Sequence, residues 1–307
     1  MSHAELRTSV LPPNVKIISQ PDHSGGFVKP NASSKGAVFI SDLELGDIFV
    51  FDEAGNPEAI IAGLSEPQGI GADLYGDVYV TNTNTSQVLV YGPDYKTVKK
   101  TLSDPGQYPV DVKYDAQTGL VGVTNITNTS GGPGSVSFYA KNATTPCVTV
   151  ANKNWTAIYF GAFDATGNFF IDGQTSSGSV LVGVVQGGCS AFSITTLTIG
   201  NTINFPGGVQ VTPSNQIAIA DQSADSIFTY NHPVGNSLGN PVDVTSLTGA
   251  SDPVEFAISR GGSLWTADAG LSSAVKYAYP AGGSAKMTIK GLKLPIGAAV
   301  NPLLVPQ

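Results

Sequence analysis

The sequence predicts an all-β fold, a six-bladed β-propeller of four-stranded antiparallel blades. The first observation is a repeat of short apolar runs ending in Asp or Asn, at Asp42, Asn82, Asn125, Asp172, Asp221 and Asp268. The second is their spacing of 40, 43, 47, 49 and 47 residues, which is typical of propeller blades. The third is a composition of 36 Gly, 20 Pro and only 12% charged residues, which favours short strands and turns over helices.

The fifth unit illustrates how each blade is expected to be built. Strands a to d are predicted at 206–212, 216–221, 227–231 and 242–249. Within the first of them, Val209 and Val211 alternate with Gly208 and Gln210, so the strand presents two different faces. A proline opens strand a in five units, at Pro67, Pro109, Pro206, Pro253 and Pro295. The fourth unit lacks this proline and carries TAIYFGAFD at 156–164 instead.

The first and last units are incomplete, and together they predict how the ring closes. Residues 294–302 resemble a strand a with nothing after it, and residues 36–42 resemble a strand b with no strand a before it. We expect the C-terminal strand to pair into the N-terminal blade, because closure removes exposed sheet edges. The chain is therefore predicted to form one propeller over 36–307 after a polar N-terminal leader over 1–35.

Charge and hydropathy exclude some classes of partner. The net charge is -8 with only 15 Lys and Arg, so a nucleic-acid partner is not expected. No apolar run approaches the length of a transmembrane helix. The N-terminus lacks the apolar core of a signal peptide. The low Lys content and the Ser, Thr, Asn and Gly-rich surface favour a secreted or periplasmic protein whose signal peptide is not in this chain, and we expect a monomer.

Two units carry a resemblance to a known family. EPQGIGADLYGDVYVTN at 66–82 and DPVEFAISRGGSLWTAD at 252–268 resemble NHL-repeat propellers, whose wider relatives include SMP-30/gluconolactonase and streptogramin-lyase-like propellers. The resemblance implies a scaffold rather than an activity, because this fold hosts binding proteins, lyases and hydrolases alike.

The lactonase relatives imply a divalent metal held over the axis by Glu, Asn and Asp. The chain has no E-G-P-x-W motif, and Gly207 and Val254 stand where the Asn and the Asp would fall. Neither residue offers a side-chain oxygen to a hard cation, so that metal site is not expected here. The chain has only three histidines, His3, His23 and His232, so the histidine chemistry of the lyase relatives is not expected either.

Asp111 and Glu255 are the main candidate ligand-binding residues. Each lies two residues after its blade's proline, in units that a six-fold ring places opposite one another, whereas the other blades carry Gly or Phe there. Gln68 is a further candidate on the same face. A divalent cation such as Ca²⁺ on the axis is one hypothesis, with the ligand set Asp111, Glu255, Asp172, Asp221 and Asp268. The alternatives are a local salt bridge or solvated rim for the first two, and capping of turns by the repeated Asp and Asn residues.

An aromatic group and a cysteine pair complete the candidates. One aromatic group could form the base of a pocket for an apolar or sugar ligand, or could instead fill space in the divergent fourth unit; it consists of Trp155, Tyr159 and Phe160. Cys147 and Cys189 lie near outer loops of neighbouring blades, where the distance argues against a disulfide and export argues for one.

These observations favour binding over catalysis. We expect an exported NHL-like propeller that binds a small molecule or a protein through its axial face and the long loops at 125–136 and 172–179. The alternative is a metal-dependent, lactonase-like hydrolase or a lyase with an atypical axial site. A structural module of the cell envelope is a third possibility.

Overall fold

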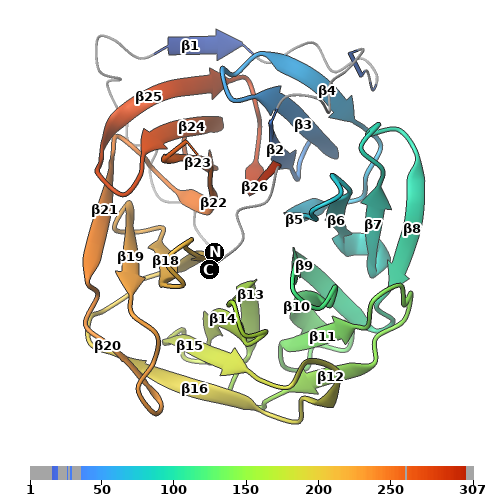
Figure 1. The fold of residues 1–307 in the computed structure, drawn as a ribbon, viewed down its shortest axis with the longest axis vertical. Coiled ribbons are helices and arrows are strands. Elements are labelled where there is room, and N and C mark those ends of the chain that lie inside the picture. The colour runs from blue at the N-terminus through green and yellow to red at the C-terminus, as the bar shows by residue number, and fades with distance from the viewer. Residues whose placement is uncertain (1–15, 20–25, 27, 30–35, 260, 302–307) are drawn as a thin grey trace.

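The predicted propeller is present. The computed structural model describes residues 16–19, 26, 28–29, 36–259 and 261–301, and six four-stranded antiparallel blades surround one axis in it (Figure 1). Blades 1 to 3 are β26–β2–β3–β4, β5–β6–β7–β8 and β9–β10–β11–β12. Blades 4 to 6 are β13–β14–β15–β16, β17–β18–β19–β21 and β22–β23–β24–β25. In each blade the first strand lies innermost and the last lies at the rim (Figure 1).

The strand bounds of the first three blades follow the predicted units. Blade 1 consists of β26 (Pro295–Asn301), β2 (Ala37–Asp42), β3 (Asp47–Asp52) and β4 (Pro57–Ile61). Blade 2 consists of β5 (Pro67–Ala72), β6 (Val78–Asn82), β7 (Gln87–Tyr91) and β8 (Val98–Ser103). Blade 3 consists of β9 (Gln107–Tyr114), β10 (Val121–Asn128), β11 (Ser135–Tyr139) and β12 (Val148–Ala151).

The strand bounds of the last three blades also follow the predicted units. Blade 4 consists of β13 (Ala157–Phe163), β14 (Phe169–Gln174), β15 (Val180–Val185) and β16 (Ile194–Ile199). Blade 5 consists of β17 (Pro206–Val211), β18 (Ile217–Asp221), β19 (Ser226–Tyr230) and β21 (Asp243–Thr248). Blade 6 consists of β22 (Pro253–Ile258), β23 (Ser263–Asp268), β24 (Ser273–Ala278) and β25 (Gly282–Lys290).

The ring closes as the two incomplete units predict. Strand β26 pairs antiparallel with β2, with Val300 opposite Val38. Part of the predicted leader lies across this junction from the outside. Its strand β1 (Lys16–Ser19) pairs in parallel with β25 of blade 6, and the Lys29 amide donates to Glu58 O of blade 1 at 2.9 Å. The described part of the leader therefore contacts both blades that meet at the closure.

Neighbouring blades are also joined at the rim. Cys147 and Cys189 form a disulfide with a Cα–Cα distance of 5.4 Å, which settles the question that the sequence left open. The bond links the segment before β12 of blade 3 to the 3₁₀ helix η3 (Gly188–Ser190) of blade 4. Strand β20 (Ser237–Gly239), from the c–d segment of blade 5, pairs with β16 of blade 4. The outer strands of blades 5 and 6 also pair in parallel, β21 with β25, so both irregular segments and regular strands join neighbouring blades.

Two of the predicted loops are shorter than expected. Strand β10 continues to Asn128 and β14 to Gln174, so residues 125–128 and 172–174 belong to strands. The extra residues are ordered by pairing with strand a, because Asn128 lies opposite Gln107 and Gln174 lies opposite Ala157. The remaining b–c connections, 129–134 and 175–179, are still longer than the four-residue connection at 222–225 in blade 5.

Candidate functional site

The six innermost strands place one residue each at the same position around the axis. These residues are Gly69, Asp111, Phe160, Gly208, Glu255 and Gly297. The axis cannot hold six side chains at this position. A Cβ on Gly69 would lie 2.4 Å from Asp111 Cα, and one on Gly208 would lie 3.1 Å from Glu255 Cα. The glycines therefore make room for the two acids.

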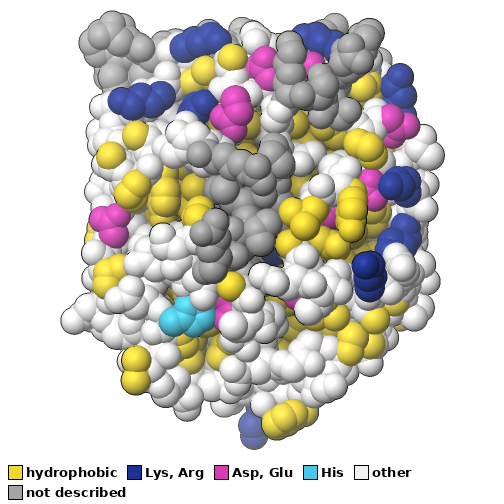
Figure 2. Space-filling model, viewed as in Figure 1, with side chains coloured by type: hydrophobic (Ala, Val, Ile, Leu, Met, Phe, Trp, Pro, Cys, Tyr) yellow, Lys and Arg dark blue, Asp and Glu magenta, His cyan; other side chains and the backbone are white. Residues whose placement is uncertain are grey.

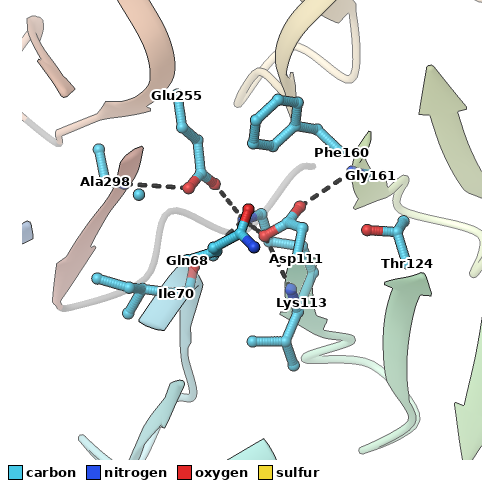
Figure 3. Close-up of polar contacts among 12 residues, drawn as sticks. Gln68, Ile70, Asp111, Lys113, Thr124, Phe160, Gly161, Glu255 and Ala298 are labelled. Carbon is cyan, nitrogen blue, oxygen red and sulfur yellow. Dashed lines mark hydrogen bonds and ion pairs between the residues drawn. The ribbon is translucent and has the colours of Figure 1, made fainter. Parts of the chain in front are cut away.

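Lys113 lies between these acids and binds both. Its Nζ is 2.6 Å from Asp111 Oδ1 and 2.5 Å from Glu255 Oε1, and it donates a third hydrogen bond to Ile70 O at 3.2 Å (Figure 3). An ammonium group has three N–H donors, so all of them are engaged. Both carboxylates are fully buried. Asp111 and Glu255 thus converge on one cation from opposite sides of the ring.

The other carboxylate oxygens are bound to backbone amides of further blades. Asp111 Oδ2 accepts from the Gly161 amide at 3.0 Å, and Glu255 Oε2 accepts from the Ala298 amide at 3.0 Å (Figure 3). Together with Lys113 and Ile70 O, this network joins blades 1, 2, 3, 4 and 6. Of the interpretations that the sequence left open, a local salt bridge describes the geometry of this pair.

Burial governs the charge states in this network. It raises the pKa of Glu255 to about 8 and also raises the pKa of Asp111, while the Lys113 ammonium opposes both shifts. Burial alone would lower the pKa of Lys113, but Asp111 and Glu255 outweigh it and the net shift is upward. Lys113 therefore stays protonated at neutral pH and is unsuited to act as a nucleophile.

The five carboxylates suggested as calcium ligands are not gathered around one point. Within the described part of the chain, no group of three or more His, Cys, Asp or Glu could hold a metal ion. The space between Asp111 and Glu255 contains the Lys113 ammonium, which would repel a cation. The geometry gives no support to an axial calcium site.

The repeated Asp residues cap loops instead. Asp268 Oδ1 accepts from the amides of Asp252 and Leu271, and its Oδ2 accepts from the amide of Ser251. Asp221 binds the loop before β17 in the same way, through the amides of Asn204 and Phe205. These bonds match the alternative in which the repeated residues have a structural role.

Asp172 departs from this pattern, in the blade that lacks the proline. Its Oδ1 accepts from the Phe160 amide at 2.9 Å, and its buried Oδ2 has no hydrogen-bond partner. Burial raises the pKa of Asp172 well above its usual range, and Asp111 and Glu255 add to the shift. Asp172 is therefore best accommodated as a neutral acid behind the network rather than as an ion ligand.

The aromatic candidates do not form a common pocket. Trp155 lies away from the axis, fully buried in the core between blades 3 and 4, and donates to Thr196 Oγ1 at 3.3 Å. This burial gives no support to a ligand-binding role for Trp155, because no face of the indole is accessible. Tyr159 donates to Gln174 Oε1, and its ring lies 6.1 Å from that of Phe205.

Phe160 and Gln68 do lie at the axis. Phe160 is 5% exposed, and its ring lies beside the two acids (Figure 3). The Gln68 side chain also points toward them, and its Nε2 donates to Thr83 Oγ1 at 3.2 Å (Figure 3). These two side chains lie next to the charged network. Together with Asp111, Lys113 and Glu255 they occupy the axis near the starts of the innermost strands.

The cavity of the axis lies at the opposite end, where the innermost strands finish. All six blades contribute to its lining: Ile70, Gly71, Ala72, Lys113, Tyr114, Asp115, Ala116, Gln117, Ala162, Phe163, Asp164, Ala165, Gln210, Val211, Ala257, Ile258, Ala298, Ala299 and Val300. This cavity was not predicted from the sequence, because the candidate ligand-binding residues lie toward the starts of these strands. The available signal was the run of alanines near their ends, because small side chains around an axis leave space.

The rim of this cavity carries exposed hydrophobic side chains. Leu74 and Tyr75, in the turn that follows β5, are 49% and 73% exposed. The same face shows a concentration of hydrophobic side chains over β5 and β6 (Figure 2). The acids at the rim already accept hydrogen bonds from the backbone. Asp115 accepts from the Gln117 amide, and Asp164 accepts from the amides of Thr166 and Asn168.

The comparisons with known proteins bear on the fold. The sequence matches no protein-family model and no curated protein. The structure resembles a chain of the "Crystal structure of Nidogen/Laminin Complex" with a TM-score of 0.67 and 13% identity, over 88% of this chain and 99% of that one. It resembles the "Streptogramin B lyase structure" with a TM-score of 0.52 and 13% identity, over 81% and 72% of the two chains.

A third similar structure is a protein of unknown function from Bacteroides caccae, with a TM-score of 0.65 and 9% identity, over 88% of this chain and 100% of that one. Identities this low show the β-propeller fold alone, and the narrower resemblance to NHL-repeat and SMP-30-like propellers stays a prediction. Among the residues with a described position, no helix is long and apolar enough to cross a membrane.

Proposed function

We propose that this chain is a binding module that holds a small molecule or a protein segment in the axial cavity at the ends of the innermost strands. The observation that carries the proposal is the contrast between this cavity and the buried charges beneath it. The cavity is lined from all six blades and has an exposed hydrophobic rim, whereas Asp111, Lys113 and Glu255 bond one another. The cavity has a volume of about 70 Å³, below the roughly 300–1,000 Å³ of drug-sized ligand sites, so we expect it to hold a small molecule or one side chain of a protein segment.

The same contrast disfavours the hydrolase and lyase alternatives. A general acid or base must reach the reacting atom, and the carboxyl groups of Asp111 and Glu255 have no exposed surface. The similarity to streptogramin B lyase concerns the scaffold only. The first structure named above is a complex of two proteins according to its title, which is consistent with this fold serving protein recognition.

Export is part of the proposal. The Cys147–Cys189 disulfide supports an oxidising location such as the periplasm or the exterior, because structural disulfides are rare in reducing cytosol. An NHL-like propeller in that location would meet ligands or partner proteins outside the cytoplasm.

Ligand screening with a blocked cavity tests the function. Thermal-shift screening of the purified protein against a metabolite and peptide library would run in parallel on Ala257→Leu, which fills the cavity, and on Ala224→Leu, whose side chain is exposed on another loop. We expect ligands that stabilise the wild type and Ala224→Leu but not Ala257→Leu. Turnover of lactone substrates that Asp111→Asn abolishes and Ala257→Leu leaves unchanged would contradict the proposal.

A further inference from the structure

A second pocket lies where the ring closes, between blades 1 and 6. We propose that this pocket binds a neutral polyhydroxylated ligand such as a monosaccharide. The inference goes beyond the proposed function, because the pocket lies beside the axial cavity and shares only Val300 with its lining. It follows from three features: the size of the pocket, a fixed pair of opposite charges at its wall, and serine hydroxyls that bond no described residue.

The pocket has the size of a small-molecule site. Its volume is about 400 Å³, whereas that of the axial cavity is about 70 Å³. Sites for small molecules usually measure roughly 300–1,000 Å³. The turn between β22 and β23 forms one wall, and there Gly261 leaves open space, because an added Cβ would have no neighbour closer than 3.9 Å. A ligand of about one sugar ring can therefore enter.

A pair of opposite charges is fixed at another wall. Lys276 Nζ lies 3.0 Å from Glu53 Oε2 and donates to Glu53 O at 2.8 Å. Trp265 Nε1 donates to the same carboxylate oxygen at 3.1 Å, and its ring centre lies 5.2 Å from Lys276 Nζ. The indole is fully buried, so it holds both charged groups in place. The Glu53 side chain is 41% exposed, and its Oε1 accepts no hydrogen bond from a described residue.

Such a pair suits a ligand that both donates and accepts hydrogen bonds. An ammonium has three N–H donors, and Lys276 uses two of them on Glu53. Adjacent hydroxyl groups of a sugar can therefore accept from Lys276 and donate to Glu53 Oε1, and hydrogen bonds to charged groups are the stronger ones. A charged ligand would attract one member of the pair but repel the other, and it would lose hydration on entry. The pair thus favours a neutral ligand.

Two serine hydroxyls of the lining have no partner in the described chain. Ser259 is 5% exposed, and its Oγ forms no hydrogen bond. At the equivalent turns of blades 3 and 4, Asp115 and Asp164 accept from the backbone amide two residues further on, which the shorter serine does not do. The half-buried Ser263 also lacks a side-chain hydrogen bond to a described residue, and Asn301 belongs to the same lining. Because buried polar groups are normally paired, ligand hydroxyls are suitable partners for these serines.

A set of neutral and charged sugars tests this assignment. D-Glucose, D-galactose, D-mannose and D-xylose would be titrated at pH 7 beside D-glucuronate and D-glucosamine, with the NMR shifts of the Gly261 and Ser263 amides as the readout. We expect at least one neutral sugar to bind, about tenfold or more tightly than either charged analogue. Equal or tighter binding of a charged analogue, or binding of none of the neutral sugars, would overturn the assignment.

Variants separate this pocket from the axial cavity. Gly261→Leu fills the pocket and should abolish sugar binding, whereas Ala224→Leu, on an exposed loop of blade 5, should not. Lys276→Met should weaken the sugar about tenfold, which is the loss of one hydrogen bond to a charged group. Ala257→Leu, which fills the axial cavity, should leave sugar binding unchanged, so the two proposals can fail separately. Sugar binding that survives in Gly261→Leu would refute the site, and unchanged affinity in Lys276→Met would refute the role of the charged pair.

Discussion

The two ends of the propeller axis are built from the same six strands, but they differ in their contents. At one end Asp111, Phe160 and Glu255 fill the space that glycines leave, and the acids are bonded to Lys113 and to backbone amides. At the other end alanines such as Ala162 and Ala257 leave a cavity. Side-chain volume and bonding, not topology, decide which end can receive a ligand. A conspicuous acid on an axis is therefore not by itself a binding site.

Removing the cation at the filled end should have the largest effect. Lys113→Met leaves two buried carboxylates without their shared partner, and we expect a loss of about 3–5 kcal/mol in the free energy of unfolding, measured in urea. Lys99→Met is the control, because the Lys99–Asp77 ion pair is partly exposed and should contribute less than about 1 kcal/mol. Similar losses in the two variants would show that the axial network does not stabilise the ring.

Adding a single methyl group at the filled end comes next. In Gly69→Ala the new Cβ would lie 2.4 Å from Asp111 Cα and 2.6 Å from Val110 O, which are backbone atoms that cannot rotate away. Overpacking of this kind costs about 1–3 kcal/mol and would be measured by the same urea unfolding. Gly261→Ala is the control, since its nearest neighbour would be 3.9 Å away. Equal stability of both variants would mean that the blades can separate at the axis.

The filled end should also set the pH dependence of stability. Burial raises the pKa of Glu255 to about 8 and that of Asp268 to about 6. At pH values between the usual carboxyl pKa and these raised values, the folded state therefore binds more protons than the unfolded state. Unfolding free energy should therefore fall as pH rises from about 4.5 to about 8. Glu255→Gln should flatten the upper part of this slope, and Asp243→Asn, which changes an exposed acid, should not. A wild-type profile that rises across this interval would refute the assignment.

The open end should show the smallest effect on stability. Ala257→Leu adds side-chain volume where space exists, so we expect a change of less than about 1 kcal/mol in unfolding free energy, together with loss of ligand binding. The measurement pairs urea unfolding with the thermal-shift ligand screen. Strong destabilisation would show that this end is as tightly packed as the other.

The repeat made the fold and part of the filled end predictable. Alternating strands and a period in the forties predict the blades, and the incomplete units predict that β26 pairs with β2. Asp111 and Glu255 were identifiable because they interrupt the repeat. That the Lys113 ammonium bridges them was not predicted, because the sequence shows which strand face a lysine shares but not the reach of its side chain across the axis.

Three other features could not be predicted from the sequence. Trp155 is adjacent in sequence to the start of β13, yet it turns into the core, where Gly173 and Gly183 leave room for its ring. The cavity at the open end exists because alanine side chains are too small to fill the space around the axis. A search for reactive side chains in the sequence does not detect such empty space. The disulfide depended on irregular segments around Cys147 and Cys189, whose path no repeat specifies.

The central claim, that the axial charges pair with one another and are not kept for a ligand, is tested most directly by the unfolding free energy of Asp111→Asn/Lys113→Met/Glu255→Gln beside that of Lys113→Met. If the charges serve only one another, neutralising all three removes the unpaired carboxylates, and the triple variant should be more stable than Lys113→Met alone. A triple variant that is as unstable as Lys113→Met, or less stable, would contradict the claim.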